Sequence, residues 1–354
     1  MKLSLICIFY FLISTFIYKT MGQEIRPIRD SVGFCWDADE MDSVINYLSK
    51  TYKWKKFSPE NLVAAISPHD DYLYAGKVYF PLYKILRTKE VVIFGVTHGT
   101  VRKAMNDLQN VLIFDDYKYW HGPYKNVKVS PLRDYIKNNL NKEYFIISDK
   151  AQNIEHSIEA LIPFLQHYNN DIKITPIMVT AMPYNRMKNI SKELSGIIIK
   201  YINQKNLELG TDIFFLISTD ADHYGEDFEN SPYGMNDKAH QIATEIDRKI
   251  ADSCLAGKIY EGKVKELTEK LWPDSNSSTV KPLWCGRYPI PFGLLTILDI
   301  INKINNKQIT GKIFKYSDTW TGKVLPIKNT HLGLTAPFSL RHWVGFLSAG
   351  FYLK

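Results

Sequence analysis

Three histidines in this chain each stand a few residues past a short run of apolar, β-prone residues. The runs and their histidines are residues 62–66 with His69, residues 91–94 with His98 and residues 213–217 with His223. In a parallel α/β sheet, ligands bind in the crevice beyond the carboxyl ends of the strands. The pattern therefore predicts that three strands deliver imidazoles to one sheet edge, as a metal site or an acid/base site requires. The alternative for any one of them is a loop histidine that only caps a turn.

Strands and helices are predicted to alternate along the whole chain. A helix at 76–86 lies between the strands at 62–66 and 91–94, which makes one strand–helix–strand crossover of a parallel sheet. Further strands are predicted at 111–114, 144–147, 172–179, 213–217, 313–317 and 344–351, and further helices at 37–52, 129–140, 158–166, 187–203, 238–253, 264–272 and 290–304. Pro176 suggests an edge strand or a bulge. Because no Pro/Gly/Ser-rich linker interrupts the pattern, we predict a single-domain α/β/α sandwich with a mostly parallel central sheet.

Charge and cysteine content narrow the class of protein. The chain has 44 Lys and Arg against 37 Asp and Glu, and the basic residues are scattered. This distribution favours solubility over nucleic-acid binding, and no nucleic-acid-binding motif is present. Beyond the first 22 residues there are three cysteines, Cys35, Cys254 and Cys285, so at least one thiol is unpaired or ligated. Whether Cys35 and Cys254 form a disulfide stays open at this point.

The N-terminus resembles a targeting segment. Lys2 precedes an apolar run at 3–17, and the small residues Thr20 and Gly22 stand before a potential cleavage point. This arrangement predicts a signal peptide at residues 1–22 and an exported protein, either periplasmic or secreted. The alternative is an uncleaved membrane anchor formed by residues 3–18.

Five polar segments surround the predicted strand ends. They are Pro68-His69-Asp70-Asp71, Gly95-Val96-Thr97-His98-Gly99, Glu155-His156-Ser157-Ile158-Glu159, Asp220-Ala221-Asp222-His223-Tyr224-Gly225 and Trp284-Cys285-Gly286-Arg287. Pro68 ends its strand and Gly76 is expected to open the next helix. A carboxylate beside a histidine orients the ring and raises its pKa, so Asp220 is expected to raise the pKa of His223. The alternatives are turn caps for Asp220 and His156 and a packing role for Cys285.

These five segments, in this order, resemble the Memo family, also called the AmmeMemoRadiSam system protein B family. Its members carry a strand ending in Pro-His, a strand ending near Ser-His, Glu-His-Ser-x-Glu, Asp-x-x-His-Tyr/Trp-Gly, and Cys-Gly before a helix. The resemblance covers about residues 27–351, which we expect to form one Memo-like α/β domain. The family is similar in fold to class III extradiol dioxygenases, which are non-haem iron enzymes that open catechol-type rings.

The resemblance implies roles for individual residues. His69, His98 and Cys285 would hold one transition metal, iron(II) or copper first and zinc as a third option. His223 would be the acid/base residue, with Asp220 beside it. Groups in the second shell or facing the substrate would be Asp70, Asp71, Asp222, His156 and Arg287. The family name also implies a functional association with AMMECR-like and radical SAM proteins.

The chain departs from the family pattern at two places near the site. Asp70-Asp71 stands where many members have Ala-Gly, and Gly99 stands where a second histidine often follows. Two extra acids beside a ligand would either add a metal ligand or repel an anionic substrate.

Three functions compete at this point. The first is a metal-dependent redox enzyme, dioxygenase-like, that acts on a small molecule. The second is a non-catalytic protein that binds a ligand or peptide in the same pocket. The third is a metal-assisted hydrolase that uses Asp70, Asp71, Asp220 and Asp222 and holds two metals about 3.5–4 Å apart.

Overall fold

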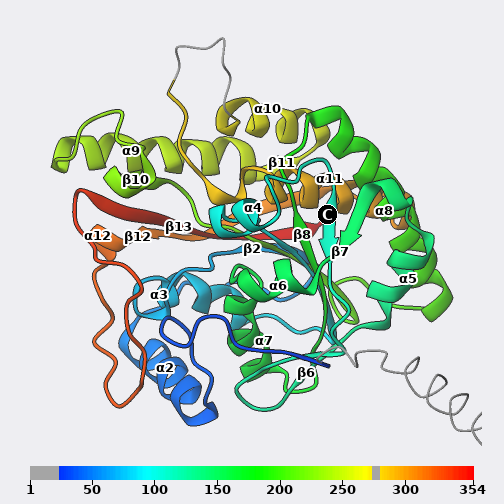
Figure 1. Ribbon diagram of the computed structural model, residues 1–354, viewed down its shortest axis with the longest axis horizontal. Coiled ribbons are helices and arrows are strands. Elements are labelled where there is room, and N and C mark those ends of the chain that lie inside the picture. The colour runs from blue at the N-terminus through cyan, green and yellow to red at the C-terminus, as the bar shows by residue number, and fades with distance from the viewer. Residues whose placement is uncertain (1–23, 273–279) are drawn as a thin grey trace, which may run out of the picture.

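The computed structural model describes residues 24–272 and 280–354, and the predicted targeting segment at 1–22 lies outside them. A 13-stranded mixed sheet runs through the molecule (Figure 1). Its strand order is β1 (Ile25–Arg26), β5 (Tyr119–Trp120), β6 (Val127–Val129), β8 (Lys173–Val179), β3 (Glu90–Gly95), β9 (Ile213–Ser218), β2 (Leu62–Ser67), β13 (His342–Leu353), β12 (Ile309–Asp318) and β11 (Gly257–Ile259). Off this path, β4 (Leu112–Phe114) pairs with β7 (Phe145–Ile147) and β8, and β10 (His223–Gly225) pairs with β13.

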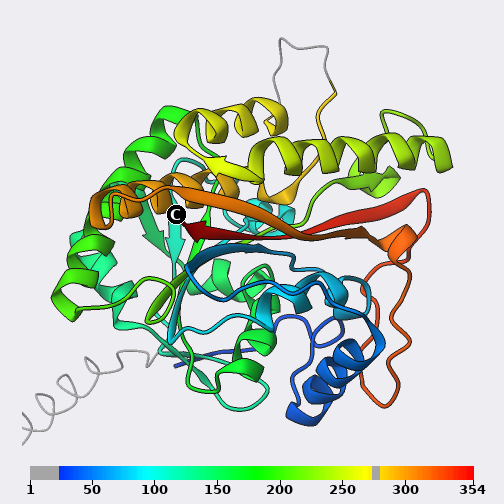
Figure 2. The ribbon, with the colours of Figure 1, turned by 180° about the vertical axis from the view of Figure 1, so that it is seen from behind.

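The centre of the sheet is parallel. Strands β6, β8, β3, β9 and β2 all run in one direction, whereas β13, β12 and β11 continue the sheet with antiparallel pairing. Figure 2 shows β13 in red between β12 and β2. Strands β3, β9 and β2 are direct neighbours, so their carboxyl ends meet at one edge.

Helices cover both faces of the sheet, as the α/β/α prediction requires. One face carries α5 (Pro131–Asn139), α8 (Tyr184–Lys205), α10 (Glu261–Leu271) and α11 (Pro289–Ile304), and the other carries α2 (Ala38–Thr51), α3 (Tyr72–Tyr83) and α7 (Ile162–Tyr168). The remaining helices are α4 (Gly99–Ala104), α6 (Asp149–Ile154), α9 (Asp237–Ile250) with a π-helical turn at Ala251–Leu255, and α12 (Thr319–Gly322). The predicted fold class is therefore confirmed.

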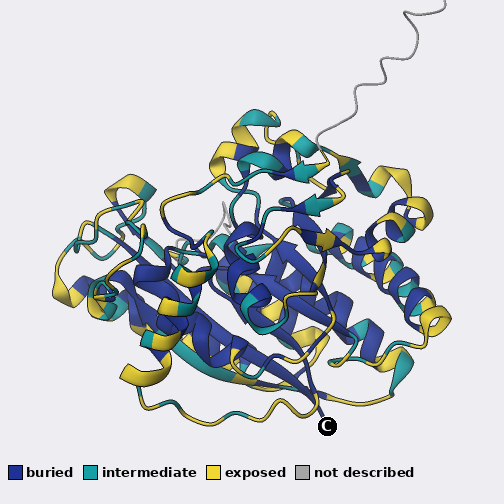
Figure 3. Cartoon of the chain, turned by 90° about the horizontal axis from the view of Figure 1, so that it is seen from below, coloured by how far each residue is buried: buried dark blue, intermediate teal, exposed yellow. Residues whose placement is uncertain are grey.

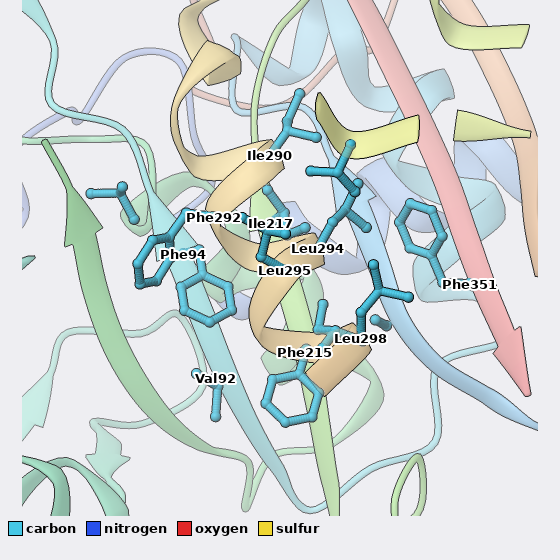
Figure 4. Close-up of a cluster of buried hydrophobic side chains, with 14 of the residues drawn as sticks. Val92, Phe94, Phe215, Ile217, Ile290, Phe292, Leu294, Leu295, Leu298 and Phe351 are labelled. Atoms are coloured by element: carbon cyan, nitrogen blue, oxygen red, sulfur yellow. The ribbon is translucent and has the colours of Figure 1, made fainter. Parts of the chain in front are cut away.

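The core consists of two large hydrophobic clusters, one on each face of the sheet. Figure 3 shows the buried strands in dark blue and the exposed residues on the outer surfaces of the helices. Helix α11 packs directly on β3 and β9, with Phe94, Ile217 and Phe292 in contact range (Figure 4). Gly293 permits this close approach, because a Cβ there would lie 2.7 Å from Ile217. Burying each large apolar side chain contributes about 1.5–3 kcal/mol, so this layer fixes the strands that carry the site.

Two local expectations were wrong. Helix α3 begins at Tyr72, so Gly76 lies inside the helix rather than at its start. All twelve residues of α3 are buried, which removes the amphipathic pattern that marks a helix boundary in sequence. Neither alternative suggested by Pro176 holds, because β8 lies between β3 and β6 and its register with β3 runs through Pro176 without a bulge. On its side away from β3, β8 pairs with β6 up to Ile174 and with β4 from Met178 onward. Pro176 lies between these two stretches, where no strand pairs with β8 on that side.

The three cysteines of the described chain are free thiols. Cys35 belongs to the hydrophobic cluster on one face of the sheet and Cys254 to the cluster on the other. The sheet therefore separates them, and the disulfide left open by the sequence does not form. Among the described residues, no helix has the length and apolar content that crossing a bilayer would need.

Candidate metal centre

Three neighbouring strands deliver the predicted residues to one point. His69 follows β2, His98 follows β3, and Asp220 follows β9, which lies between them. Cys285 reaches the same point from a 3₁₀ turn, Cys285–Arg287, just before α11. One ligand atom from each of His69, His98 and Cys285 lies within 4.8 Å of the others, and the same holds for Asp220, His223 and Cys285. The expected convergence of these side chains is therefore confirmed.

The tautomer of His69 is fixed by a chain of hydrogen bonds. The Ser218 hydroxyl donates to the carbonyl of Ser157 at 2.5 Å, so its oxygen is left to accept from Nδ1 of His69 at 2.7 Å. Nδ1 therefore carries the proton and Nε2 carries a lone pair. His69 is 1% exposed, and burial, followed by the nearby His98, lowers its pKa well below the usual value. It remains neutral at physiological pH, which is the form that binds metals.

His98 is oriented by Glu155, a buried carboxylate at the start of the Glu155–Glu159 segment, to which the sequence analysis gave no role of its own. Glu155 accepts from the backbone N–H of His98 at 2.9 Å and from its Nδ1 at 2.7 Å. It also accepts the backbone N–H groups of His156 and Ser157, both at 2.9 Å. Burial disfavours a charged His98, but the Glu155 carboxylate and the contact with Cys285 raise its pKa well above the usual value. A carboxylate behind a histidine is the common support of a metal ligand, and it leaves Nε2 facing the site.

The environment of His223 differs from the expected one. Its Nδ1 donates to the carbonyl of Ala221 at 3.1 Å, and burial, followed by the charge of His98, lowers its pKa to about 3. The expectation that Asp220 raises the pKa of His223 was therefore wrong. Asp220 accompanies His69 instead, accepting its backbone N–H at 3.1 Å and placing Oδ2 3.3 Å from its Nε2.

The donor set at the centre fits a metal cation. Nε2 of His69 carries a lone pair, yet it faces Sγ of Cys285 at 3.4 Å and Oδ2 of Asp220 at 3.3 Å. The imidazole nitrogen, the sulfur and the carboxylate oxygen can all donate electron pairs. A shared proton or a metal cation between them would accept these electron pairs. Burial raises the pKa of the Cys285 thiol and that of Asp220, the latter to about 7. Imidazole, thiolate and carboxylate together suit a transition metal.

A second pair of buried carboxylates holds the segment that carries Cys285. Asp222 accepts the N–H of Leu283 at 2.6 Å, and Asp247 of α9 accepts the indole N–H of Trp284 at 2.6 Å. Burial raises the pKa of Asp222 to about 6 and that of Asp247 to about 8. Asp222 therefore supports the site through the backbone, and Asp247 was not found from the sequence.

The two acids beside His69 have different partners. Asp71 accepts both the N–H of Thr335 at 2.6 Å and its hydroxyl at 3.1 Å, so it fixes a distant loop to the start of α3. Asp70 accepts only the N–H of Asp71, at 2.6 Å, and faces a cavity. His156 stacks on the ring of His98 with centroids 4.6 Å apart, and burial lowers its pKa to about 4.

Two cavities meet at this cluster, and His98, His223 and Phe228 line both. The basic chamber, of about 450 Å³, contains Arg102, Arg287 and Cys285. The acidic chamber, of about 460 Å³, contains His69 and four aspartates, Asp30, Asp70, Asp71 and Asp220, together with Arg29 and His156. Arg287 thus lines the site as expected, whereas Arg102, in the last turn of α4, was not found from the sequence.

Comparison with known proteins identifies the family of this chain. The family model described as Memo-like protein matches residues 33–325. A MEMO1 family protein of Aquifex aeolicus is 28% identical over 191 residues, which are 53% of this chain and 63% of that protein. One of Pyrococcus horikoshii is 25% identical over 249 residues, 66% of this chain and 79% of that protein. One of Methanosarcina barkeri is 22% identical over 279 residues, 76% of this chain and 89% of that protein. The family model covers most of the chain, and this protein therefore belongs to the Memo-like family.

Proposed function

We propose that this Memo-family protein binds one redox-active transition metal through His69, His98 and Cys285 and uses it in oxidative chemistry on a small molecule. The observation that carries the proposal is the meeting of lone pairs at the cluster, with Nδ1 of each ligand histidine engaged by Ser218 or Glu155. Iron(II) and copper are the first candidates for this ligand set, and zinc is the third. When bound, such an ion would supply electron transfer and Lewis acidity.

The side chains around the centre would bind the substrate and move protons. Glu155 and Ser218 fix the orientation of the His98 and His69 imidazoles through hydrogen bonds, and neither residue lines the two chambers. His223 lines both chambers, and its Nδ1 is already bonded to Ala221. Its Nε2 would accept a hydrogen bond from the substrate and relay its proton, and because its pKa in the free protein is about 3 it would hold that proton only transiently. His223→Gln is then expected to retain metal while turnover drops.

The competing functions are less well supported. A two-metal hydrolase would need free aspartates, but Asp71 is bonded to Thr335 and Asp222 to Leu283 and Asn230. A non-catalytic ligand- or peptide-binding protein would use the same pocket without metal. An association with AMMECR-like and radical SAM proteins would follow from family membership and remains a proposal, as does export directed by residues 1–22.

Metal stoichiometry tests the proposal. Chelator-stripped, reduced protein is titrated with iron(II), copper(I) or zinc, desalted and measured by elemental analysis. We expect about one equivalent in the wild type and much less in Cys285→Ala and His98→Ala, because a single site with these ligands loses most of its affinity without one of them. Cys254→Ala and His167→Ala are matched controls away from the cluster, and they should retain the metal.

Oxygen uptake by the desalted, metal-loaded protein, with ascorbate as electron donor, tests the redox part. We expect uptake above that of equally treated Cys285→Ala. Wild-type protein that retains no metal would favour the binding function, and two equivalents would favour the hydrolase. Equal metal content in Cys285→Ala and Cys254→Ala would refute the ligand assignment.

A further inference from the structure

The two chambers that meet at the candidate metal centre differ in charge. The basic chamber presents two guanidinium groups, Arg102 and Arg287, and one carboxylate, Asp107. Asp107 accepts a hydrogen bond from Gln109 at 2.8 Å. Within residues 24–272 and 280–354, no ion pair joins either arginine to an acid, and Arg287 lies over the ring of Tyr288 at 5.7 Å. The basic chamber therefore has a surplus of positive charge beside Cys285 and His98.

The acidic chamber has the opposite character. Its four aspartates outnumber its single arginine, Arg29. An anion placed there would meet further carboxyl groups at short range, which is unfavourable in a buried site. An anionic ligand that reaches the metal centre is therefore directed into the basic chamber.

Most of the remaining wall of the basic chamber is apolar, apart from Thr97, Gln109 and the hydroxyl-bearing Tyr288. The apolar part of the wall is formed by Val96, Val179, Ala181, Phe228, Leu283 and Pro289. A chamber of about 450 Å³ falls within the range of small-molecule sites, in which apolar walls hold the body of a ligand and a few polar groups fix its orientation. Guanidinium groups match the planar carboxylate with paired hydrogen bonds.

We propose that the substrate is an organic acid with an apolar body, with its carboxylate at Arg102 and Arg287 and its other end at His98, Cys285 and His223. This inference rests on the proposed function, since it names the substrate class of the same site. The apolar walls distinguish such an acid from inorganic phosphate, which carries charge but no body to bury.

Calorimetric titration of the full chain with 2-naphthoate tests the proposal. The titrations are made in chelator, so the outcome is independent of metal binding and is separable from the metal titrations above. We expect one naphthoate site, with affinities at least tenfold lower for the neutral 2-naphthamide and for inorganic phosphate. Naphthamide binding as tightly as naphthoate would show that the arginines do not recognise charge, and phosphate binding as tightly would show that the apolar walls are not used. Either result overturns the proposal.

Charge-matched variants locate the site. Arg102→Ala and Arg287→Ala should each weaken naphthoate binding at least fivefold, and Arg287→Lys should fall between Arg287→Ala and the wild type. Arg29→Ala removes the same charge from the acidic chamber and should bind naphthoate within twofold of the wild type. Arg102 is exposed on a short helix, so its variant should fold even if the Arg287 variants do not. Equal losses in Arg102→Ala and Arg29→Ala would place the anion elsewhere and refute the assignment.

Discussion

Replacing Asp247 by leucine should destabilise the protein and release the segment that carries Cys285. Asp247 is fully buried, and its carboxyl oxygens accept three donors. These are the Trp284 indole N–H at 2.6 Å, the Tyr316 hydroxyl at 2.7 Å and the Asp222 backbone N–H at 3.3 Å. A buried donor left without an acceptor costs about 1–3 kcal/mol. Three donors lose their acceptor in this variant, and burial of the apolar leucine side chain offsets part of that cost. The expected loss in free energy of unfolding is therefore about 3–6 kcal/mol.

Asp247→Asn is the matched control. The amide oxygen keeps an acceptor for Trp284, the bond to Tyr316 can reverse, and only the long bond from the Asp222 backbone N–H is lost, so we expect a loss of about 1–3 kcal/mol. Urea unfolding followed by circular dichroism at pH 6 measures both variants. The asparagine variant should also keep its metal, while the leucine variant should lose metal under conditions in which it is still folded. A leucine variant as stable as the asparagine variant would refute the view that these hydrogen bonds fix the Cys285 segment.

Three other perturbations test the packing and electrostatics around the site. Gly293→Ala should lower the free energy of unfolding, because overpacking against Ile217 at 2.7 Å costs about 1–3 kcal/mol and outweighs a helix-propensity gain of about 1 kcal/mol. In Gly196→Ala the added Cβ meets nothing within 4 Å, so urea unfolding should show a higher free energy of unfolding. Equal changes in Gly293→Ala and Gly196→Ala would contradict the packing argument. Gly286→Ala would bring a Cβ to 1.9 Å from the Thr219 hydroxyl. Metal titration of the folded variant should therefore show at least tenfold weaker metal binding. Unchanged affinity would show that the turn at Cys285–Arg287 can adapt to the added methyl group. Burial raises the pKa of Asp220 to about 7 and that of Asp247 to about 8, so the folded state holds protons that the unfolded state releases. Their stabilisation is complete below pH about 4 and is lost as the pH rises to about 8. The contribution of these two groups to the melting temperature should therefore fall as the pH rises from about 4 to about 8, less steeply in Asp247→Asn than in the wild type, and parallel profiles would refute the assignment.

The sequence predicts the strands that carry the site, because each is a short, fully buried apolar run. Strand β9 (Ile213–Ser218), in which every residue is buried, is an example. The sequence also singles out His69 and His98, since their placement beyond strand ends is a local signal, whereas Cys285 could be assigned to the site only through the resemblance to the Memo family. The boundaries of α3 could not be predicted, because a helix buried on all sides has no polar face.

The supporting partners of the site depend on tertiary contacts that no local pattern encodes. Glu155 meets His98 across 57 positions of the chain, and Asp247 meets Trp284 across 37. The environment of His223 was mispredicted for the same reason. Asp220 is near in sequence, but burial and the charge of His98 decide the pKa, and both arise only from the folded arrangement.

The position of β13 has a consequence for biosynthesis. This strand, His342–Leu353, follows every other described strand in the sequence, yet it lies inside the sheet between β2 and β12. Until the C-terminal residues leave the ribosome, β2 and β12 are open edges with unpaired backbone groups, which are the usual templates for aggregation. Pairings between elements so distant in sequence also form slowly. The nascent chain must therefore remain incompletely folded until β13 has been synthesised, and loss of this strand would split the sheet beside His69 rather than trim its margin.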